Sequence, residues 1–177
     1  IKNLFSKNFN YIPVIKNKKL IDIIFKDKIK KISNNTKIPV VIMAGGKGTR
    51  LEPFTSVLPK PLIPINGKPI INHIIDRFSE HGFFEYYVSI NYKSRILKAF
   101  FEESKKSNNI HFIEEKKPLG TVGALSKIKK YVKSHFFVTN CDIIIDCDYN
   151  DIIKNHKESK NLVTVVASFR NYTIPYG

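Results

Sequence analysis

One short stretch constrains the fold of this chain more than any other: an apolar run that passes directly into a glycine-rich loop. Residues 40–44 (VVIMA) are apolar and largely β-branched, which predicts a buried strand, and residues 45–50 (GGKGTR) form the glycine loop. Glycines let the backbone turn sharply and present bare N–H groups that attract anions. The loop is neither a Walker A loop nor a dinucleotide fingerprint, because Lys47 lies inside the glycine cluster and Leu51 stands where a last glycine would.

The patterns that follow the loop alternate between helix and strand. Apolar residues at helical spacing predict helices, the first beginning at Pro69, and short β-branched or aromatic runs predict strands. The expected helices cover residues 69–81, 93–104, 121–132 and 149–159, and the expected strands cover residues 85–91, 110–115, 135–140 and 162–169. This order predicts an α/β, Rossmann-like fold with a mostly parallel sheet and helices on both faces. Ligands bind such sheets beyond the carboxyl ends of their strands.

The first 37 residues differ from the rest of the chain. The segment YIPVIKNKKLIDII reads as a strand, an Asn/Lys turn and a second strand or short helix, and a Lys-rich linker follows it. It resembles the closing part of a CBS domain, although an arbitrary β-hairpin fits the same pattern. We therefore divide the chain into a CBS-like tail and basic linker, residues 1–37, and a second domain, residues 38–177.

Composition restricts the partners of this chain. Hydrophobic residues make up 42% and charged residues 25% of its 177 residues, as in a soluble globular domain. No apolar run approaches the roughly 20 residues of a membrane span, so we expect no membrane partner. The net charge is +15, but the lysines are spread singly and no nucleic-acid-binding motif occurs. We therefore expect anionic small substrates and no nucleic acid.

Cysteine usage and the N-terminus bear on the compartment. Cys141 and Cys147 indicate neither a disulfide framework nor a zinc site. The first residues lack the long apolar core and the small-residue cleavage site of a signal peptide. A reducing cytoplasm fits these features best. The sequence leaves a homo-oligomer open.

Two basic residues follow the glycines at positions that suit a polyphosphate. Arg50 ends the glycine loop, and its planar guanidinium group matches phosphate oxygens. Lys60 lies between Pro59 and Pro61, which we expect to hold its backbone extended. The sequence therefore predicts a phosphate site formed by the glycine loop, Arg50 and Lys60.

The motif MAGGKGTRLEPFTSVLPKPLIPINGKPIINHII, with PLGTVGAL and TNCD further along the chain, resembles the sugar-phosphate nucleotidyltransferase family. Mannose-1-phosphate guanylyltransferases and glucose-1-phosphate thymidylyltransferases belong to that family. The resemblance covers residues 38–177 and implies transfer of a nucleotidyl group from a nucleoside triphosphate (NTP) to a sugar 1-phosphate, with release of pyrophosphate. It also implies the nucleotide-binding part of a longer enzyme, so we expect weak or no catalysis from the 177 residues alone.

The resemblance assigns roles to individual residues. Arg50 and Lys60 would hold the triphosphate, and Asp142 would bind Mg²⁺; these three are the expected catalytic residues. The expected nucleotide contacts are Ala44, Gly45, Gly46, Gly48, Thr49, Arg50, Lys60, Glu115, Gly120 and Thr121. Where this chain has Cys141, the family has a glycine before the metal-binding Asp. In the family, a second metal-binding Asp and a Lys for the sugar phosphate come later than residue 177.

The base and the reaction each retain alternatives. Glu115 matches a family position that reads the base edge. A carboxylate only accepts hydrogen bonds, so it favours guanine, which offers N1–H and N2–H₂ donors together; the expected NTP is GTP. Residues 146–148 spell D-x-D, a metal signature of glycosyltransferases that use nucleotide sugars, although Asp148 could simply cap the next helix. A non-catalytic nucleotide-sensing module is the other alternative, because CBS domains often bind adenine nucleotides in a regulatory role.

Overall fold

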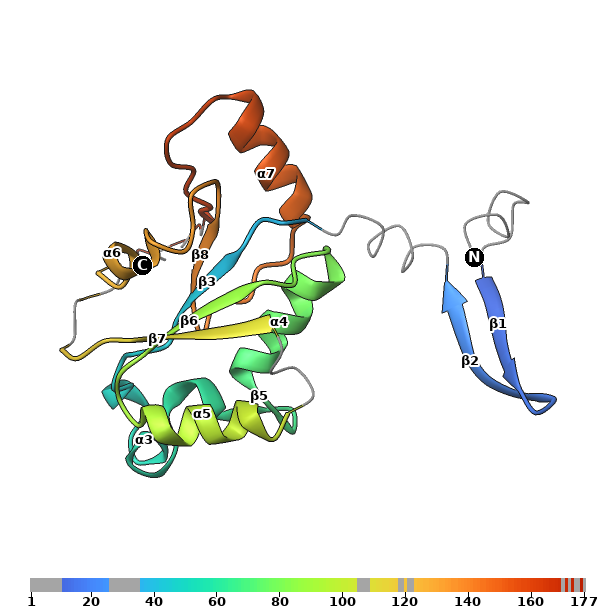
Figure 1. Cartoon of the computed structure of the whole chain (residues 1–177), viewed down its shortest axis with the longest axis horizontal. Helices are drawn as coiled ribbons and strands as arrows, with labels where there is room; N and C mark the ends of the chain where they lie inside the picture. Colours follow the sequence, from blue (N-terminus) through green and yellow to red (C-terminus); the bar gives the residue numbers. More distant parts are fainter. Residues whose placement is uncertain are drawn as a thin grey trace. The chain divides into compact units, whose positions relative to one another are not determined.

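The computed structural model describes residues 11–25, 36–104, 109–117, 120, 123–169, 171, 173 and 176 of the chain (Figure 1). The chain divides into two compact units, Ile1–Asp146 and Cys147–Gly177, and each is described by itself. The first unit contains a two-stranded hairpin, a four-stranded sheet with its helices, and a short two-stranded ribbon. The described residues of the second unit form one helix and part of the C-terminal segment.

The elements predicted between residues 40 and 159 occur in the predicted order, with differences in extent. The strands are β1 (Tyr11–Lys16), β2 (Lys19–Phe25), β3 (Val40–Met43), β4 (Pro64–Ile65), β5 (Lys68–Pro69), β6 (Tyr86–Ile90), β7 (Ile110–Glu114) and β8 (Phe137–Asn140). The helices are α3 (Phe54–Val57), α4 (Ile70–Glu80), α5 (Ser94–Glu102), α6 (Leu125–Ile128) and α7 (Tyr149–Glu158), with 3₁₀ turns η1 (Thr49–Leu51) and η2 (Lys60–Leu62).

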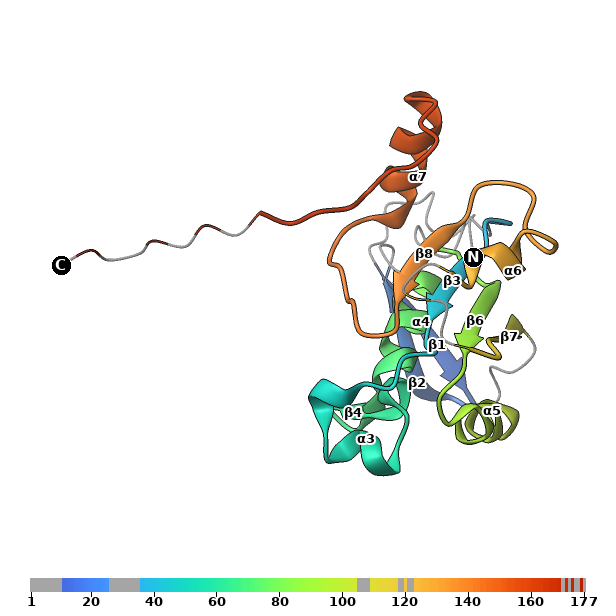
Figure 2. The same ribbon diagram turned by 90° about the vertical axis from the view of Figure 1, so that its left-hand side faces the viewer.

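The central sheet is parallel and has the strand order β7-β6-β3-β8. β3 lies in its interior: Val40 aligns with Tyr86 of β6 on one side and with Phe137 of β8 on the other. Figures 1 and 2 both show β3 between these two strands. β3 is short, apolar and β-branched, which suits a strand covered on both faces. The expected α/β fold with a mostly parallel sheet is confirmed.

Helices cover both faces of this sheet. On one face, Phe78 of α4 packs edge-on against Phe137, with ring centroids 5.4 Å apart, and Phe101 of α5 contacts Phe112 of β7 at 5.9 Å. On the other face, Ile128 of α6 packs in a buried cluster with Val41, Tyr87 and Ile113. As a result every side chain of β6 is buried. The apolar face of α4 consists of Ile71, Ile74, Ile75 and Phe78.

The helix expected over residues 121–132 is wrong in extent, because α6 covers only Leu125–Ile128. Gly123 has low helix propensity, and Lys127 and Lys130 would repel each other three residues apart on a longer helix. Thr121, the expected first cap of that helix, lies outside the described residues.

Pro69 also differs from expectation. It pairs with Pro64 in the β4–β5 ribbon and precedes α4 instead of starting it. A proline φ near −65° is compatible with extended and helical backbone alike, so the pairing across the Asn66-Gly67 turn decides between them.

The strand expected over residues 162–169 is absent from the second unit as described. These residues form no strand, and the side chains of Leu162 and Phe169 are both 99% exposed. A β-prone run becomes a strand only where a neighbouring strand accepts and donates its backbone hydrogen bonds, and no strand occurs among the described residues of this unit. The expectation about Asp148 is confirmed: its Oδ1 accepts the Asn150 N–H at 2.8 Å, which caps α7.

The N-terminal hairpin forms as the sequence suggests. β1 and β2 pair in antiparallel fashion around Asn17 and Lys18, whose positive φ angles of 51° and 60° suit a two-residue hairpin turn. Ile15 and Leu20 are more than half exposed. The resemblance of this hairpin to a CBS domain stays a prediction, as does the division of the chain at residue 37.

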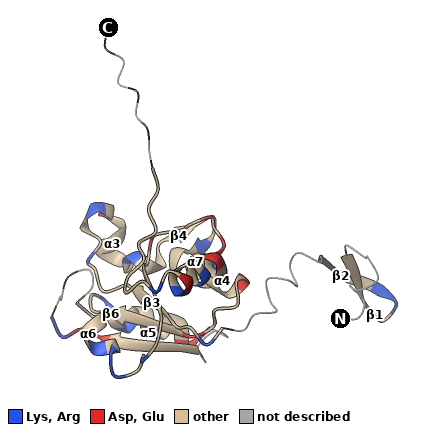
Figure 3. Ribbon diagram, turned by 90° about the horizontal axis from the view of Figure 1, so that it is seen from above, with Lys and Arg blue, Asp and Glu red and all other residues tan. Residues whose placement is uncertain are grey.

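None of the described helices is long and apolar enough to cross a membrane. Lys and Arg lie on separate elements, including the β1–β2 hairpin and α6 (Figure 3). This distribution agrees with the singly spread lysines of the sequence.

Candidate active site

The glycine loop leaves the carboxyl end of β3, at the point where the strand order of the sheet reverses. From β3 the chain builds β6 and β7 on one side and then returns to add β8 on the other. The loops after β3 and β8 therefore start side by side, and the Cys141 N–H donates to the Met43 carbonyl at 3.2 Å. Open α/β sheets bind ligands in the crevice at such a reversal point. The topology thus favours the residues of these two loops as the site.

Gly48 has a backbone conformation that only glycine adopts without strain. Its φ is 70°, and a Cβ added there would lie 2.9 Å from Cγ2 of Thr55 and 3.1 Å from Cβ of Lys60. The site therefore requires the absence of a side chain for two separate reasons. At Gly46, by contrast, an added Cβ would meet no atom within 4 Å.

A set of hydrogen bonds links the glycine loop to Thr55 and, through Thr55, to Tyr92 and Lys93. The buried Thr55 donates its hydroxyl to the Gly48 carbonyl at 3.0 Å. The carbonyl of Thr55 accepts in turn from the Tyr92 hydroxyl at 3.4 Å and from the Lys93 ammonium at 3.2 Å, and the same ammonium also donates to the Ser56 carbonyl. Sequence reasoning did not find Lys93, because its partners lie 37 and 38 residues away and no motif marks it.

Removing the Thr55 hydroxyl tests this support. We expect Thr55→Val to lower the free energy of unfolding of the 177-residue chain by about 1 kcal/mol, because it removes one partly buried hydrogen bond without changing side-chain shape. Ser126→Ala is the control, since it removes an exposed hydroxyl that also donates to a glycine carbonyl, that of Gly123. Urea denaturation of both variants gives the comparison, and equal losses would contradict the supporting role of Thr55.

Lys60 and Asp142 form an ion pair across 82 residues of sequence. Their side chains are 27% and 36% exposed, so both reach the surface beside the loop. The expectation that the prolines hold Lys60 extended is wrong: Lys60 begins the 3₁₀ turn η2, because Pro61 at the start of a helical turn needs no N–H donor. The pairing itself was not predicted. It brings together the two residues that the sequence assigned separately to triphosphate and metal.

Glu115 lies at the other side of the loop and is buried, with 8% of its surface exposed. Its carboxylate accepts a hydrogen bond from the Ser89 hydroxyl, and its carbonyl accepts one from the side-chain amide of Asn91. A Cβ added at Gly45 would lie 3.1 Å from Oε1 of Glu115. The structure thus places Glu115 against the first glycine of the loop. The preceding residue, Glu114, is by contrast exposed and paired with Lys98.

The remaining predicted residues have less defined surroundings. Ala44 is buried, and its N–H donates to the Ser89 carbonyl at 3.0 Å. Thr49 and Arg50 are exposed in η1, and the structure does not bring Arg50 into the Lys60–Asp142 pair. Gly120 has a φ of 79°, and Thr121 lies outside the described residues.

Cys141 stands where the resemblance implies a glycine, and it is buried next to Asp142 in the sequence. Burial raises the pKa of its thiol to about 11, and the neighbouring Asp142 carboxylate adds to this effect. The thiol is therefore protonated at neutral pH.

The D-x-D residues are engaged in other ways. Asp146 forms an ion pair with Arg77 of α4, and Asp148 caps α7. The ion pair of Asp146 was not predicted, whereas the cap was the simpler reading of Asp148. Both contacts account for the aspartates without a metal.

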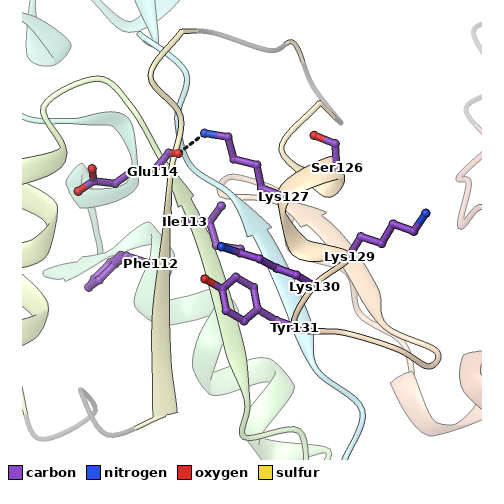
Figure 4. A pocket seen from close by; sticks show the side chains of 8 residues that line it. All are labelled: Phe112, Ile113, Glu114, Ser126, Lys127, Lys129, Lys130 and Tyr131. Carbon is purple, nitrogen blue, oxygen red and sulfur yellow. Dashed lines mark hydrogen bonds between the residues drawn. The ribbon is translucent and has the colours of Figure 1, made fainter.

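A pocket of about 660 Å³ lies beside β7 and α6. Figure 4 shows Lys127 donating to the Glu114 carbonyl, and Lys130 extends over the Tyr131 ring, 4.7 Å from its centroid. Its lining consists of Phe112, Ile113, Glu114, Ser126, Lys127, Lys129, Lys130 and Tyr131. Among the residues that the structure describes, none of those predicted to bind the nucleotide lines this pocket.

Known proteins share the sequence of this region. The chain is 36% identical over 120 residues to a D-glycero-α-D-manno-heptose 1-phosphate guanylyltransferase from Campylobacter jejuni, which covers 68% of this chain and 53% of the relative. It is 33% identical over 142 residues to a mannose-1-phosphate guanyltransferase from Debaryomyces hansenii, which covers 77% of this chain and 39% of the relative. The chain thus spans about half the length of these relatives or less.

Solved structures share the fold. The crystal structure of HddC from Yersinia pseudotuberculosis complexed with GMP-PN has a TM-score of 0.61 and 33% identity, covering 67% of this chain and 54% of that one. A UDP-glucose pyrophosphorylase complexed with UDP-glucose has a TM-score of 0.57 at 20% identity, covers 70% of this chain and 54% of that one, and shows the fold alone. Residues 39–177 match the family described as nucleotidyl transferase. With that match over most of its length, the chain belongs to the nucleotidyl transferase family.

Proposed function

We propose that this chain supplies the nucleotide-binding part of an enzyme that transfers a nucleotidyl group from an NTP to a sugar 1-phosphate. The observation that carries the proposal is that groups suited to the two ends of a nucleotide lie next to different glycines of one loop. Lys60 and Asp142 lie beside Gly48, and Glu115 lies beside Gly45. A nucleotide laid along the loop would direct its phosphates to the first pair and its base to Glu115.

The chemistry requires alignment and charge neutralisation more than proton transfer. The phosphate oxygen of the sugar 1-phosphate attacks the α-phosphorus, a new P–O bond forms, and the bond to the β-phosphate oxygen breaks, so that pyrophosphate leaves with the bonding electrons. The attacking group is already an anion and needs no general base. Arg50, Lys60 and the loop N–H groups would offset the repulsion between two anions and stabilise the charge that develops.

The residues beside the loop suit a Mg²⁺ ion that is held partly by the protein and partly by the phosphates of the substrate. Proteins hold Mg²⁺ with one or two carboxylates, and water and substrate phosphate oxygens complete its shell. Asp142 supplies one carboxylate, and the described residues contain no group of three or more potential metal ligands. When bound, Mg²⁺ neutralises phosphate charge. Asp142 would hold the ion and Lys60 would hold phosphate oxygens, so nucleotide binding would replace their mutual ion pair.

GTP is the NTP that the site favours. The Glu115 carboxylate can accept hydrogen bonds from both N1–H and the 2-amino group of guanine, whereas thymine and uracil offer a single N3–H. Guanylyltransferases from Campylobacter jejuni and Debaryomyces hansenii among the relatives support this choice. The same relatives suggest heptose 1-phosphate and mannose 1-phosphate as the acceptors to try first. We also propose a cytoplasmic location, because both cysteines are thiols, as in a reducing compartment.

Pyrophosphate release from the full-length protein tests the function. GTP, dTTP, UTP and CTP are each supplied with mannose 1-phosphate or D-glycero-D-manno-heptose 1-phosphate and Mg²⁺, and we expect GTP to give the highest kcat/KM. A preference for a pyrimidine nucleotide would refute the role of Glu115.

Sugar transfer from a nucleotide sugar, without pyrophosphate, would support the glycosyltransferase alternative. Unchanged turnover in an Arg50→Ala, Asp142→Asn double variant would refute the mechanism, and nucleotide binding without turnover would support the sensing module.

A further inference from the structure

Ser89 is a polar residue in a strand that is otherwise apolar and aromatic. It is fully buried in β6, and its hydroxyl donates to Oε1 of Glu115. A buried hydroxyl costs free energy unless it is hydrogen-bonded, so its presence in the core requires a partner. The carboxylate of Glu115 is that partner, although the two residues are 26 positions apart.

Hydrogen bonds fix both backbone polar groups of Glu115, its N–H and its carbonyl. Its N–H donates to the Ile90 carbonyl at 2.9 Å, which continues the pairing of β7 with β6 by one residue. Its carbonyl accepts from the side-chain amide of Asn91. Two consecutive residues at the end of β6 therefore hold the main chain of Glu115, and Ser89 holds its side chain.

The glycine loop also lies next to the Glu115 carboxylate. An added Cβ at Gly45 would lie 3.1 Å from Oε1 of Glu115 and 3.3 Å from Cβ of Asn91. Oε1 therefore has the Ser89 hydroxyl and the first glycine of the loop as neighbours, and these two contacts restrain the carboxylate. A fixed acceptor distinguishes donor patterns better than a mobile one, because a wrong base then leaves a buried group unpaired.

We propose that Ser89 is the positioning residue for base selection: its hydroxyl orients the Glu115 carboxylate toward a purine that carries adjacent N1–H and 2-amino donors. This inference rests on the function proposed above. Ser89 does not touch the nucleotide in this arrangement. It acts through Glu115, and its loss weakens discrimination between bases more than it weakens turnover itself.

The comparison of GTP with ITP isolates this effect, because the inosine base keeps N1–H and lacks the 2-amino group. In the full-length protein, we expect Ser89→Ala to lower the ratio of kcat/KM for GTP over ITP about tenfold, as for the loss of one hydrogen bond to a charged group. Glu115→Gln should lower the ratio by at least as much, and adding Ser89→Ala to it should change the ratio no further. Ser104→Ala, which removes a hydroxyl bonded to the Phe101 carbonyl, is the control and should leave the ratio unchanged.

The outcomes separate this inference from the proposed function. An unchanged ratio in Ser89→Ala, or an equal loss with both nucleotides, overturns the positioning role. An unchanged ratio in Glu115→Gln overturns it too and leaves nucleotidyl transfer intact. Failure of the wild-type protein to release pyrophosphate from any NTP refutes the proposed function itself. Ser89→Cys keeps a weak S–H donor at nearly the same volume, and an intermediate ratio in that variant supports the inference even where Ser89→Ala folds poorly.

Discussion

Lys60→Met in the full-length protein is expected to lower kcat/KM for the NTP by about 10²–10³-fold, the usual cost of removing one preorganised donor that stabilises developing charge. The aliphatic stem of Lys60 lies beside Gly48, and its ammonium pairs with Asp142. Its loss would remove a cation from the phosphate site and leave the Asp142 carboxylate without this partner. Both changes oppose the binding of a triphosphate anion. Initial rates of pyrophosphate release at several NTP concentrations measure the effect.

Lys68→Met is the matched control for this experiment. Lys68 also forms an ion pair with an aspartate, Asp76, and its side chain is 36% exposed, close to the 27% of Lys60. We have assigned Lys68 no role in the site, so kcat/KM should change by less than about threefold, as for a surface ion pair of low worth. Comparable losses in the two variants would show that any lost Lys–Asp pair disables the protein and would contradict a phosphate role for Lys60.

Gly48→Ala is expected to be the most harmful single-methyl change in the glycine loop. The positive φ of Gly48 adds backbone strain of about 1–2 kcal/mol for a residue with a Cβ. The methyl would also lie 2.9 Å from Cγ2 of Thr55, which is buried and cannot easily move. Together these effects should lower the free energy of unfolding by about 2–4 kcal/mol and displace the loop N–H groups. Thermal or urea denaturation measures the first effect, and the KM for the NTP reports the second.

Gly46→Ala provides the comparison within the same loop. A Cβ at Gly46 meets no atom within 4 Å, so the folded chain has space for the methyl group. We expect a change in stability of less than about 1 kcal/mol, of either sign. A loss of stability at Gly46 equal to that at Gly48 would show that the loop geometry described here is wrong. A higher KM at Gly46 without a loss of stability would instead indicate that the bound nucleotide approaches this glycine.

Local patterns in the sequence were sufficient where an element could be recognised from its own residues. The apolar spacing of α4 and the β-branched run of β3 predicted their types. Burial of one helix face leaves apolar residues at helical spacing, and burial of both faces of a strand leaves a short continuous apolar run. Element extent was less predictable. α6 is shorter than its pattern suggests, and residues 162–169 have the composition of a strand without a neighbouring strand to pair with among the described residues of their unit.

The sequence by itself was sufficient to identify the glycine loop, the basic residues Arg50 and Lys60, and the family to which the chain belongs. These features depend on short motifs that follow one another along the chain. Only the tertiary structure decided that Lys60 pairs with Asp142 and that Ser89 orients Glu115. The buried serine in the run YYVSI was the one signal in the sequence that could have pointed to the second contact. Such contacts join residues 26 and 82 positions apart, and their geometry follows from strand order and register, which local residue patterns do not encode.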